Sequence, residues 1–296
     1  MNRFPDFVII GAMKCATSTL HDQLNAQPGF FMSEPKEPYF FSDDPVWARG
    51  LDWYTDLFAA AEATDICGES TTHYTKLPTY PDTIQRMVEH IPDAKLIYVM
   101  RHPIDRLVSQ YVHQWTEREI EIPIDQAIHE HPELIAYSKY AMQLAPFFEH
   151  WDASEILPVF FENIRSNPSP ELERVASFLG YDRTTVWADL ESSNVSAQRM
   201  RQSPLRDAIV NAPGVAQLRQ NLIPQSVRDR VKDRWKMADR PELSESSAAE
   251  LTTIFNADLA TLSGWLGTEL TCENWSETVT SQSFEWAADE VPRRAA

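Results

Sequence analysis

The chain has 296 residues, of which 43% are hydrophobic, so it can bury a sizeable core and form one large domain or two small ones. It carries 44 acidic side chains against 26 lysines and arginines, and this formal charge of −18 argues against nucleic acid or an acidic polysaccharide as a partner. An anionic ligand must therefore enter a local basic pocket. No apolar run approaches the roughly 20 residues that a membrane span requires.

The first predicted strand covers residues 7–10 (FVII), which are apolar and partly β-branched, as in a strand buried on both faces. It is followed by Gly11, a loop of small residues with one cation, Lys14, and a helix that begins near Thr17. Free backbone amides, a helix N-terminus, hydroxyls and an ammonium group together favour anion binding. The loop lacks the GxxxxGK[ST] pattern of ATPases, because Thr17 stands where that lysine would be. A phosphate-binding loop and an ordinary strand-to-helix turn both fit this stretch.

Residues 33–44 (SEPKEPYFFSDD) predict a fixed, extended loop, because two prolines flank Lys36 and Glu37. Three aromatic residues, 39–41, follow directly. The loop is either an ordinary surface segment with its rings tucked under, or a pocket wall that holds Glu37 against apolar rings. In the second case desolvation would raise the pKa of Glu37.

The clearest buried strand is predicted for residues 95–100 (KLIYVM). Arg101 follows it at once, and Pro103 suits the first turn of a helix that carries Ser109. An arginine at a strand end often forms only a structural salt bridge. In an open α/β sheet, however, ligands bind at the carboxyl edge of the strands, where the first loop also lies.

Alternating strands and helices predict a single α/β domain over residues 1–270, with a mainly parallel central sheet flanked by helices. The acidic stretch after it, residues 271–296, is predicted to be a solvated tail. The other expected strands are 30–32, 65–68 and 156–161, and the other expected helices are 47–61, 81–91, 124–130, 139–151, 171–179, 215–235 and 248–266.

A polar segment at 194–206 carries Arg199, Arg201 and Arg206, which form either a solvated loop or a local anion site in an acidic chain.

The three cysteines have no paired spacing, so neither a disulfide framework nor a metal site is predicted. The first residues, MNRFPDF, run directly into a strand and leave no room for a signal peptide. We therefore expect a cytoplasmic protein.

Four segments, in this order, resemble motifs of the sulfotransferases that use 3′-phosphoadenosine-5′-phosphosulfate (PAPS), in the branch related to heparan-type and bacterial carbohydrate or small-molecule enzymes. GAMKCATSTL resembles the 5′-phosphosulfate loop, and KEPYFF resembles the KEPHFF motif. LIYVMRHPIDRLVSQY resembles the 3′-phosphate motif, and FFENIRSNP with VASFLG resembles a later stretch of the family. The resemblance implies a P-loop-like fold and sulfuryl transfer from PAPS, with 3′-phosphoadenosine-5′-phosphate (PAP) as product, to a hydroxyl or amine.

The resemblance also implies residue roles. Lys14 would hold the sulfuryl and bridging oxygens, and Glu37 would be the base. The 5′-phosphate loop would be Cys15, Ala16, Thr17, Ser18 and Thr19, the 3′-phosphate would contact Arg101 and Ser109, and Arg199 and Arg201 would close over the nucleotide. The acceptor would be a small molecule, glycan or lipid that is not polyanionic, and no metal is implied.

The chain departs from the family pattern at four positions. Ala16 replaces a glycine, so the loop is expected to avoid a positive φ there. Tyr39 replaces a common histidine, His102 replaces an aspartate or asparagine, and Ser70 stands where heparan-type enzymes have a lysine. A small-metabolite kinase, which would need Mg²⁺ and the missing GK[ST], and a catalytically silent nucleotide-binding protein are the alternatives.

Overall fold

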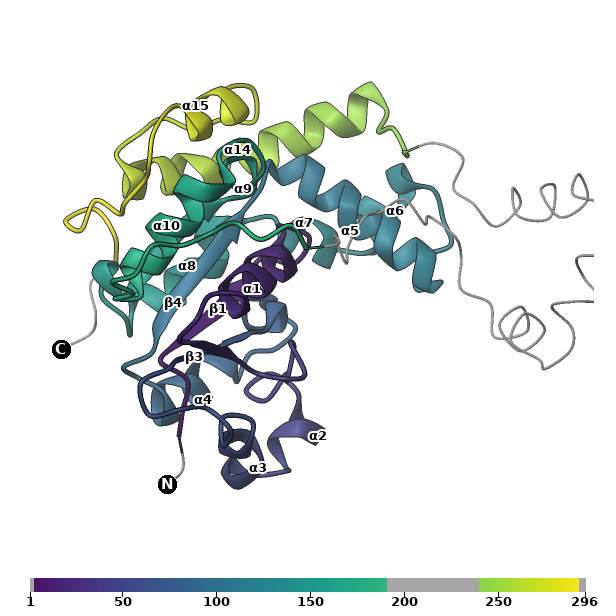
Figure 1. Ribbon diagram of the computed structural model, residues 1–296. Helices are drawn as coiled ribbons and strands as arrows, with labels where there is room; N and C mark the ends of the chain where they lie inside the picture. Colours follow the sequence, from purple (N-terminus) through teal and green to yellow (C-terminus); the bar gives the residue numbers. More distant parts are fainter. Residues whose placement is uncertain (1–2, 191–239, 293–296) are drawn as a thin grey trace, which may run out of the picture.

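The computed structural model describes residues 3–190 and 240–292, and its centre is a five-stranded parallel sheet (Figure 1). The strand order is β2-β3-β1-β4-β5. All residues of the first and last strands are buried, which is why both are continuous apolar runs. The prediction of a single α/β domain with a mainly parallel sheet is confirmed. The strands are β1 (Phe7–Gly11), β2 (Phe30–Met32), β3 (Ile66–Ser70), β4 (Lys95–Met100) and β5 (Ile156–Phe160).

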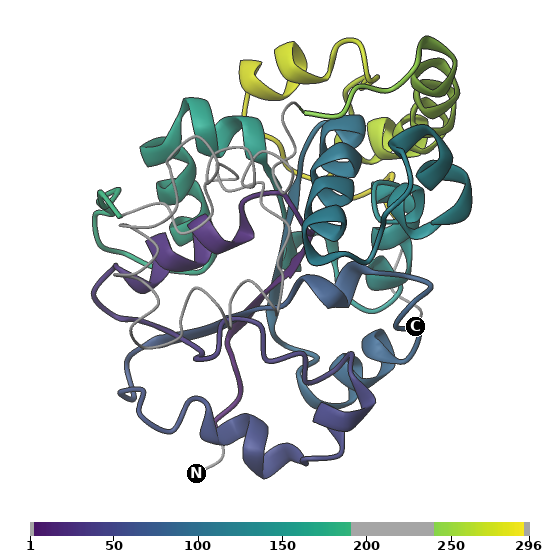
Figure 2. The same cartoon turned by 90° about the vertical axis from the view of Figure 1, so that its right-hand side faces the viewer.

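Helices cover both faces of this sheet. From β1 the chain crosses toward β2 in one direction, whereas from β4 it crosses toward β5 in the other, and right-handed connections then place the intervening helices on opposite faces. Figure 2 shows this for the purple α1 and the blue-green α5. The helices around the sheet are α1 (Thr17–Asn25), α4 (Thr83–His90), α5 (Pro103–Glu117), α8 (Tyr140–Phe148), α9 (Phe161–Ser166), α10 (Pro168–Phe178) and α14 (Glu245–Leu266). Helices α6 (Ile124–Glu130) and α7 (Glu133–Ala136) pack on α5.

The strand order creates a crevice at the carboxyl edge of the sheet. Neighbouring strands β1 and β4 send their following chain in opposite directions, and such a switch point is where open α/β sheets bind ligands. The loop with Lys14 follows β1, and Arg101 follows β4 directly. The fold thus brings the two predicted phosphate-binding segments to one place.

The region 47–61 is not one helix, as predicted, but two short ones. They are α2 (Asp44–Trp47) and α3 (Leu51–Asp56), separated by Gly50 with φ 82°. A positive φ suits glycine and cannot continue a helix. The apolar pattern of the sequence continues through this turn, which is why a single helix was predicted. Two 3₁₀ helices, η1 (Thr72–Thr75) and η2 (Ala153–Glu155), were also not predicted.

The segment after residue 270 packs on the domain, so the prediction of a solvated tail is wrong for 271–292. Helix α15 (Trp275–Ser281) lies against α9, as Figure 1 shows in yellow and green. The carboxylates of this segment face water, but its apolar side chains enter the core and anchor it. The buried ones are Trp275, Val279, Phe284, Trp286 and Val291.

Two further predictions lie outside the described residues: the helix 215–235 and the basic segment with Arg199 and Arg201. Within 3–190 and 240–292, no helix is long and apolar enough to cross a membrane.

Candidate active site

The loop between β1 and α1 takes a tight, partly left-handed path. Lys14 has φ 71° and Ala16, the N-cap of α1, has φ 66°, so the expectation that the loop avoids a positive φ at Ala16 is wrong. At Gly11 a Cβ would collide with Thr75 Oγ1, and that hydroxyl instead donates to the Ile10 carbonyl at 2.7 Å. The path leaves the first amides of α1 without intrahelical partners at the mouth of a cavity.

The left-handed alanine predicts an unusual stability effect. We expect Ala16→Gly to raise the free energy of unfolding by up to about 1 kcal/mol, because glycine adopts a positive φ without strain. The matched control is Ala26→Gly, where φ is −77° and glycine should lower stability by about 0.5–1 kcal/mol. Urea unfolding of both variants measures the difference, and a loss of stability at position 16 would contradict this account.

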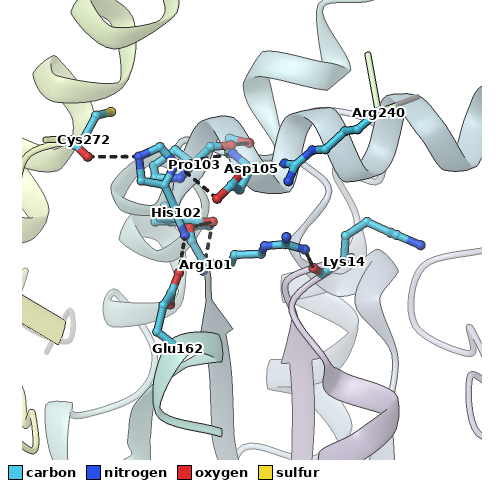
Figure 3. Close-up of polar contacts among 10 residues, drawn as sticks. Lys14, Arg101, His102, Pro103, Asp105, Glu162, Arg240 and Cys272 are labelled. Carbon is cyan, nitrogen blue, oxygen red and sulfur yellow. Dashed lines mark hydrogen bonds and ion pairs between the residues drawn. The ribbon is translucent and has the colours of Figure 1, made fainter. Parts of the chain in front are cut away.

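Arg101 is held in place by three neighbours. Its guanidinium lies 4.5 Å from the centre of the Phe161 ring, and its Nη1 donates to the Lys14 carbonyl at 3.2 Å. Its backbone N–H donates to the Tyr140 hydroxyl at 3.2 Å. Figure 3 shows the Lys14 side chain extending away from the Arg101 guanidinium, so the two cations point to different parts of the cavity. The site therefore has two separate positions for negative charge.

His102, which replaces the acidic or amide residue of the family motif, caps α5. Its Nδ1 accepts a hydrogen bond from the Asp105 amide at 3.4 Å, and its Nε2 contacts the Cys272 carbonyl at 3.0 Å (Figure 3). Its own amide donates to Glu162 Oε1 at 3.0 Å. The imidazole thus performs the capping task that an Asp or Asn side chain performs at this kind of position.

Arg106 connects helix α5 to the loop of Lys14. It is fully buried, and its guanidinium donates to the carbonyls of Met13, at 3.5 Å, and Leu134, at 2.9 Å. It also donates to Gln110 Oε1 at 2.7 Å. This buried cation fixes the loop relative to the helix that carries Ser109.

Glu37 lines the same cavity as the Lys14 loop. Its carboxylate pairs with Lys36 Nζ at 2.9 Å and accepts a hydrogen bond from Thr72 Oγ1 at 3.0 Å. Burial raises the pKa of Glu37, but the charge and hydrogen bond of Lys36 and the hydroxyl of Thr72 outweigh it and hold the pKa below its usual value. Glu37 is therefore ionised at neutral pH, held by specific contacts, and 22% exposed toward the cavity.

Three aromatic rings in contact form part of the cavity wall that also includes Glu37. His73 contacts Tyr39, at 4.2 Å between ring centroids and tilted by 36°, and stacks on Tyr80 at 4.5 Å. Its Nδ1 contacts Asp43 at 3.0 Å, and burial lowers its pKa, which favours the neutral imidazole. Tyr39, at the position of the histidine in the KEPHFF motif, thus packs against His73.

The cavity has a volume of about 880 Å³ and contains most of the predicted site residues. Cys15 does not line it: its side chain is fully buried, and its amide donates to the Ala12 carbonyl at 3.2 Å. Ser70 does not line it either and contacts His21 Nδ1 at 2.9 Å inside the protein. The predicted residues that line it are Lys14, Ala16, Thr17, Ser18, Thr19, Glu37, Arg101 and Ser109.

Several lining residues were not predicted from the sequence. Lys76, Tyr80, Gln114, Glu119, Glu133 and Tyr137 lie outside the recognised motifs. Phe161 belongs to the FFENIR segment, but no role was predicted for it. In the described part of the chain, no three His, Cys, Asp or Glu side chains are grouped in a way that could hold a metal ion.

The chain is similar to proteins of one known family. The model of the sulfotransferase domain matches residues 4–265. A mouse (Mus musculus) heparan sulfate glucosamine 3-O-sulfotransferase 3B1 is 31% identical over 191 residues, which is 61% of this chain and 47% of that protein. A human (Homo sapiens) bifunctional heparan sulfate N-deacetylase/N-sulfotransferase 2 is 26% identical over 214 residues, 64% of this chain and 24% of that protein.

The fold has a solved counterpart. The crystal structure of a sulfotransferase from Alicyclobacillus acidocaldarius superposes with a TM-score of 0.64 at 22% identity, covering 90% of this chain and 98% of that one. The matched region spans less than half the length of the mammalian relatives, so their acceptors and partners are not transferred with the family. With a family match over nearly the whole described domain and the same fold, the chain belongs to the sulfotransferase family.

Proposed function

We propose that this chain is a PAPS-dependent sulfotransferase that acts on a hydroxyl, or an amine, of a small-molecule, sugar or lipid acceptor. The observation that carries the proposal is that Lys14 and Arg101, which follow the neighbouring strands β1 and β4, line one cavity together with Glu37. A volume of about 880 Å³ lies within the usual range of ligand sites.

The residues present fit a donor with two separate phosphate positions. The amides and hydroxyls of Thr17, Ser18 and Thr19 suit a 5′-phosphate at the start of α1, and Lys14 suits the oxygens that link it to the sulfuryl group. Arg101, with Ser109 on α5, the helix that follows it, suits a 3′-phosphate. Bound there, PAPS would supply an activated sulfuryl group.

Catalysis would then consist of alignment and charge stabilisation, as in phosphoryl transfer. Lys14 would stabilise negative charge on the departing phosphate. Glu37, held by Lys36 and Thr72, would take the proton of the acceptor. A general base must be held in a fixed position within hydrogen-bond distance of the acceptor, and it must have an oxygen free to take the proton. The contacts of Glu37 with Lys36 and Thr72 provide the fixed position.

The charge of the acceptor side supports a neutral or cationic acceptor. The described lining of the cavity carries the carboxylates of Glu37, Glu119 and Glu133 and the cations Lys14, Lys76 and Arg101. Since Lys14 and Arg101 are assigned to the donor, Lys76 is the one lysine or arginine of this lining left for the acceptor, against three carboxylates. A polyanion would meet these acids and a chain of formal charge −18. We therefore propose an acceptor different in charge from the polysaccharides in the names of the mammalian relatives.

Nucleotide preference tests the proposal against the kinase alternative. PAP should raise the melting temperature far more than ATP, because ATP lacks the 3′-phosphate that Arg101 and Ser109 are placed to bind. Charge-assisted hydrogen bonds to a phosphate are worth about 1.5–3 kcal/mol each. Arg101→Ala should remove most of the preference, and EDTA should leave it unchanged.

The control for this measurement is Lys139→Ala, a lysine beside a different cavity between α8 and α14. This variant should retain the preference for PAP. Equal stabilisation of the wild-type protein by ATP and PAP would exclude the 3′-phosphate assignment.

A further inference from the structure

Lys76 is a cation of the acceptor side that the donor assignment does not use. It follows η1 directly, and its side chain lines the same cavity as Lys14 and Glu37. Among the described residues, its ammonium group has no hydrogen bond or ion pair, and it lies 5.8 Å from the centre of the Tyr137 ring. A partly buried ammonium without a partner is costly to the free protein, which is typical of a group that a ligand completes.

Helix η1 links Lys76 to the proposed base. Thr72, the first residue of η1, donates to Glu37 Oε2 at 3.0 Å, and Lys76 directly follows its last residue. Burial lowers the pKa of Lys76 to about 8; Arg106 also lowers it, while Glu37, Asp43 and Glu119 raise it. Lys76 and Glu37 therefore line one cavity from segments that are joined by a hydrogen bond.

Lys14 and Lys76 reach this cavity from different segments of the chain. Lys14 lies in the loop between β1 and α1, and Lys76 lies in the chain after η1, the 3₁₀ helix that carries Thr72, the donor to Glu37. His113, on α5, lines the cavity as well; burial lowers its pKa first, and the charges of Lys14 and Lys76 lower it further.

We propose that Lys76 is a catalytic residue that contacts the acceptor, its ammonium donating a hydrogen bond to the oxygen from which Glu37 takes the proton. The inference rests on the proposed function. The bond between sulfur and the acceptor oxygen forms as the bond between sulfur and the 5′-phosphate oxygen breaks. The acceptor proton passes to Glu37, the electron pair of the broken bond leaves with the phosphate, and Lys76 keeps its protons.

This role predicts a dependence on acceptor acidity. A cation beside the oxygen helps most when the proton is hard to remove, and helps little when the hydroxyl is already acidic. A lysine that instead contacted the sulfuryl oxygens would accelerate every acceptor by a similar factor. The two roles therefore differ in how the effect of the lysine varies along a series of acceptors.

The experiment compares wild type with Lys76→Met, which keeps the length of the side chain and removes its charge. Phenols of decreasing acidity, from 4-nitrophenol through phenol to 4-methoxyphenol, serve as acceptors, since the cavity has the rings of Tyr39, Tyr80 and Tyr137 along its wall. We expect kcat/KM to fall about 10- to 100-fold for the least acidic phenol, as for loss of one charge-assisted hydrogen bond, and much less for 4-nitrophenol. PAP affinity should not change.

The matched control is Lys139→Met, which should behave as wild type with every phenol. An equal loss for all phenols, an unchanged rate, or a wild-type enzyme that sulfates none of them would overturn the role of Lys76. None of these three results contradicts the proposed function if PAP binds in preference to ATP and some acceptor is sulfated. Failure of both of those measurements would remove the proposed function itself.

Discussion

Glu37→Gln should bind PAP normally and lose about 10²-fold or more in turnover, the usual contribution of a positioned general base. Glutamine keeps the shape of the side chain and can still accept a hydrogen bond from Thr72, but it cannot take a proton. The pKa of Glu37 is held low by Lys36 and Thr72, so the wild-type carboxylate is ionised and ready at neutral pH. Rates at saturating PAPS and a direct PAP titration measure the two quantities separately.

The control for this variant is Glu34→Gln in the same loop, where the side chain is exposed and does not line the cavity. It should keep the wild-type rate. If Glu37→Gln also turned over at nearly the wild-type rate, the base would have to be sought at His73 or His113. Both imidazoles line the cavity, and burial lowers the pKa of each, which keeps them neutral and able to accept a proton.

Lys14→Ala should lower kcat by about 10²–10³-fold while it weakens PAP binding much less, because its charge is needed most as the departing phosphate gains negative charge. Burial and the nearby Arg101 lower the pKa of Lys14, whose side chain is partly buried. Charge stabilisation is strongest in such a site.

Arg101→Ala provides the contrast to Lys14→Ala. The Arg101 guanidinium is fixed by Phe161 and by the Lys14 carbonyl, away from the Lys14 ammonium, so its loss should weaken donor binding more than it lowers kcat at saturating donor. Steady-state rates over a range of PAPS concentrations separate the two effects. A Lys14→Ala variant with the wild-type kcat would exclude Lys14 from the chemistry.

The part of the fold that could be predicted from sequence is the part that local pattern encodes. Strands such as 7–10 and 95–100 are buried on both faces, and a continuous apolar run reports that directly. The parallel order of those strands then brought Lys14 and Arg101 together, as expected. The motifs therefore predicted that these residues line one cavity, and their roles toward the donor stay a prediction.

The wrong predictions concern the segment after residue 271 and the backbone at Ala16, where tertiary packing decides the structure. Acidic residues dominate the average composition after residue 271, but Trp275, Phe284 and Trp286 decide where that segment lies, because each buries a large ring. At Ala16 the local preference against a positive φ was overridden by the geometry of the loop. Such an override is common at functional sites.

The lining residues outside the motifs were the least predictable part of the site. Lys76, Tyr80 and Tyr137 belong to no motif; the hydroxyl of Tyr137 bonds to Thr79, its ring lies near Lys76, and these contacts bring the chain after α7 to the cavity. A single lysine between threonine and leucine has no sequence signature of its own. Its significance depends on the neighbours that the fold supplies.

The central claim is that this cavity transfers a sulfuryl group from PAPS to a neutral or cationic acceptor, and a labelled-donor assay tests it most directly. Wild-type protein and Lys14→Ala are incubated with PAPS carrying radioactive sulfur, in the presence of EDTA, with separate pools of alcohols, amino alcohols, phenols and heparan-type polysaccharide. Parallel reactions contain ATP labelled in its terminal phosphate.

We expect the wild-type protein to move labelled sulfur to a neutral or cationic acceptor, with one PAP released for each sulfated product, and the Lys14→Ala variant to move little. Transfer from ATP with none from PAPS would contradict the account in favour of a kinase. PAP binding without transfer to any pool would instead identify a catalytically silent nucleotide-binding protein.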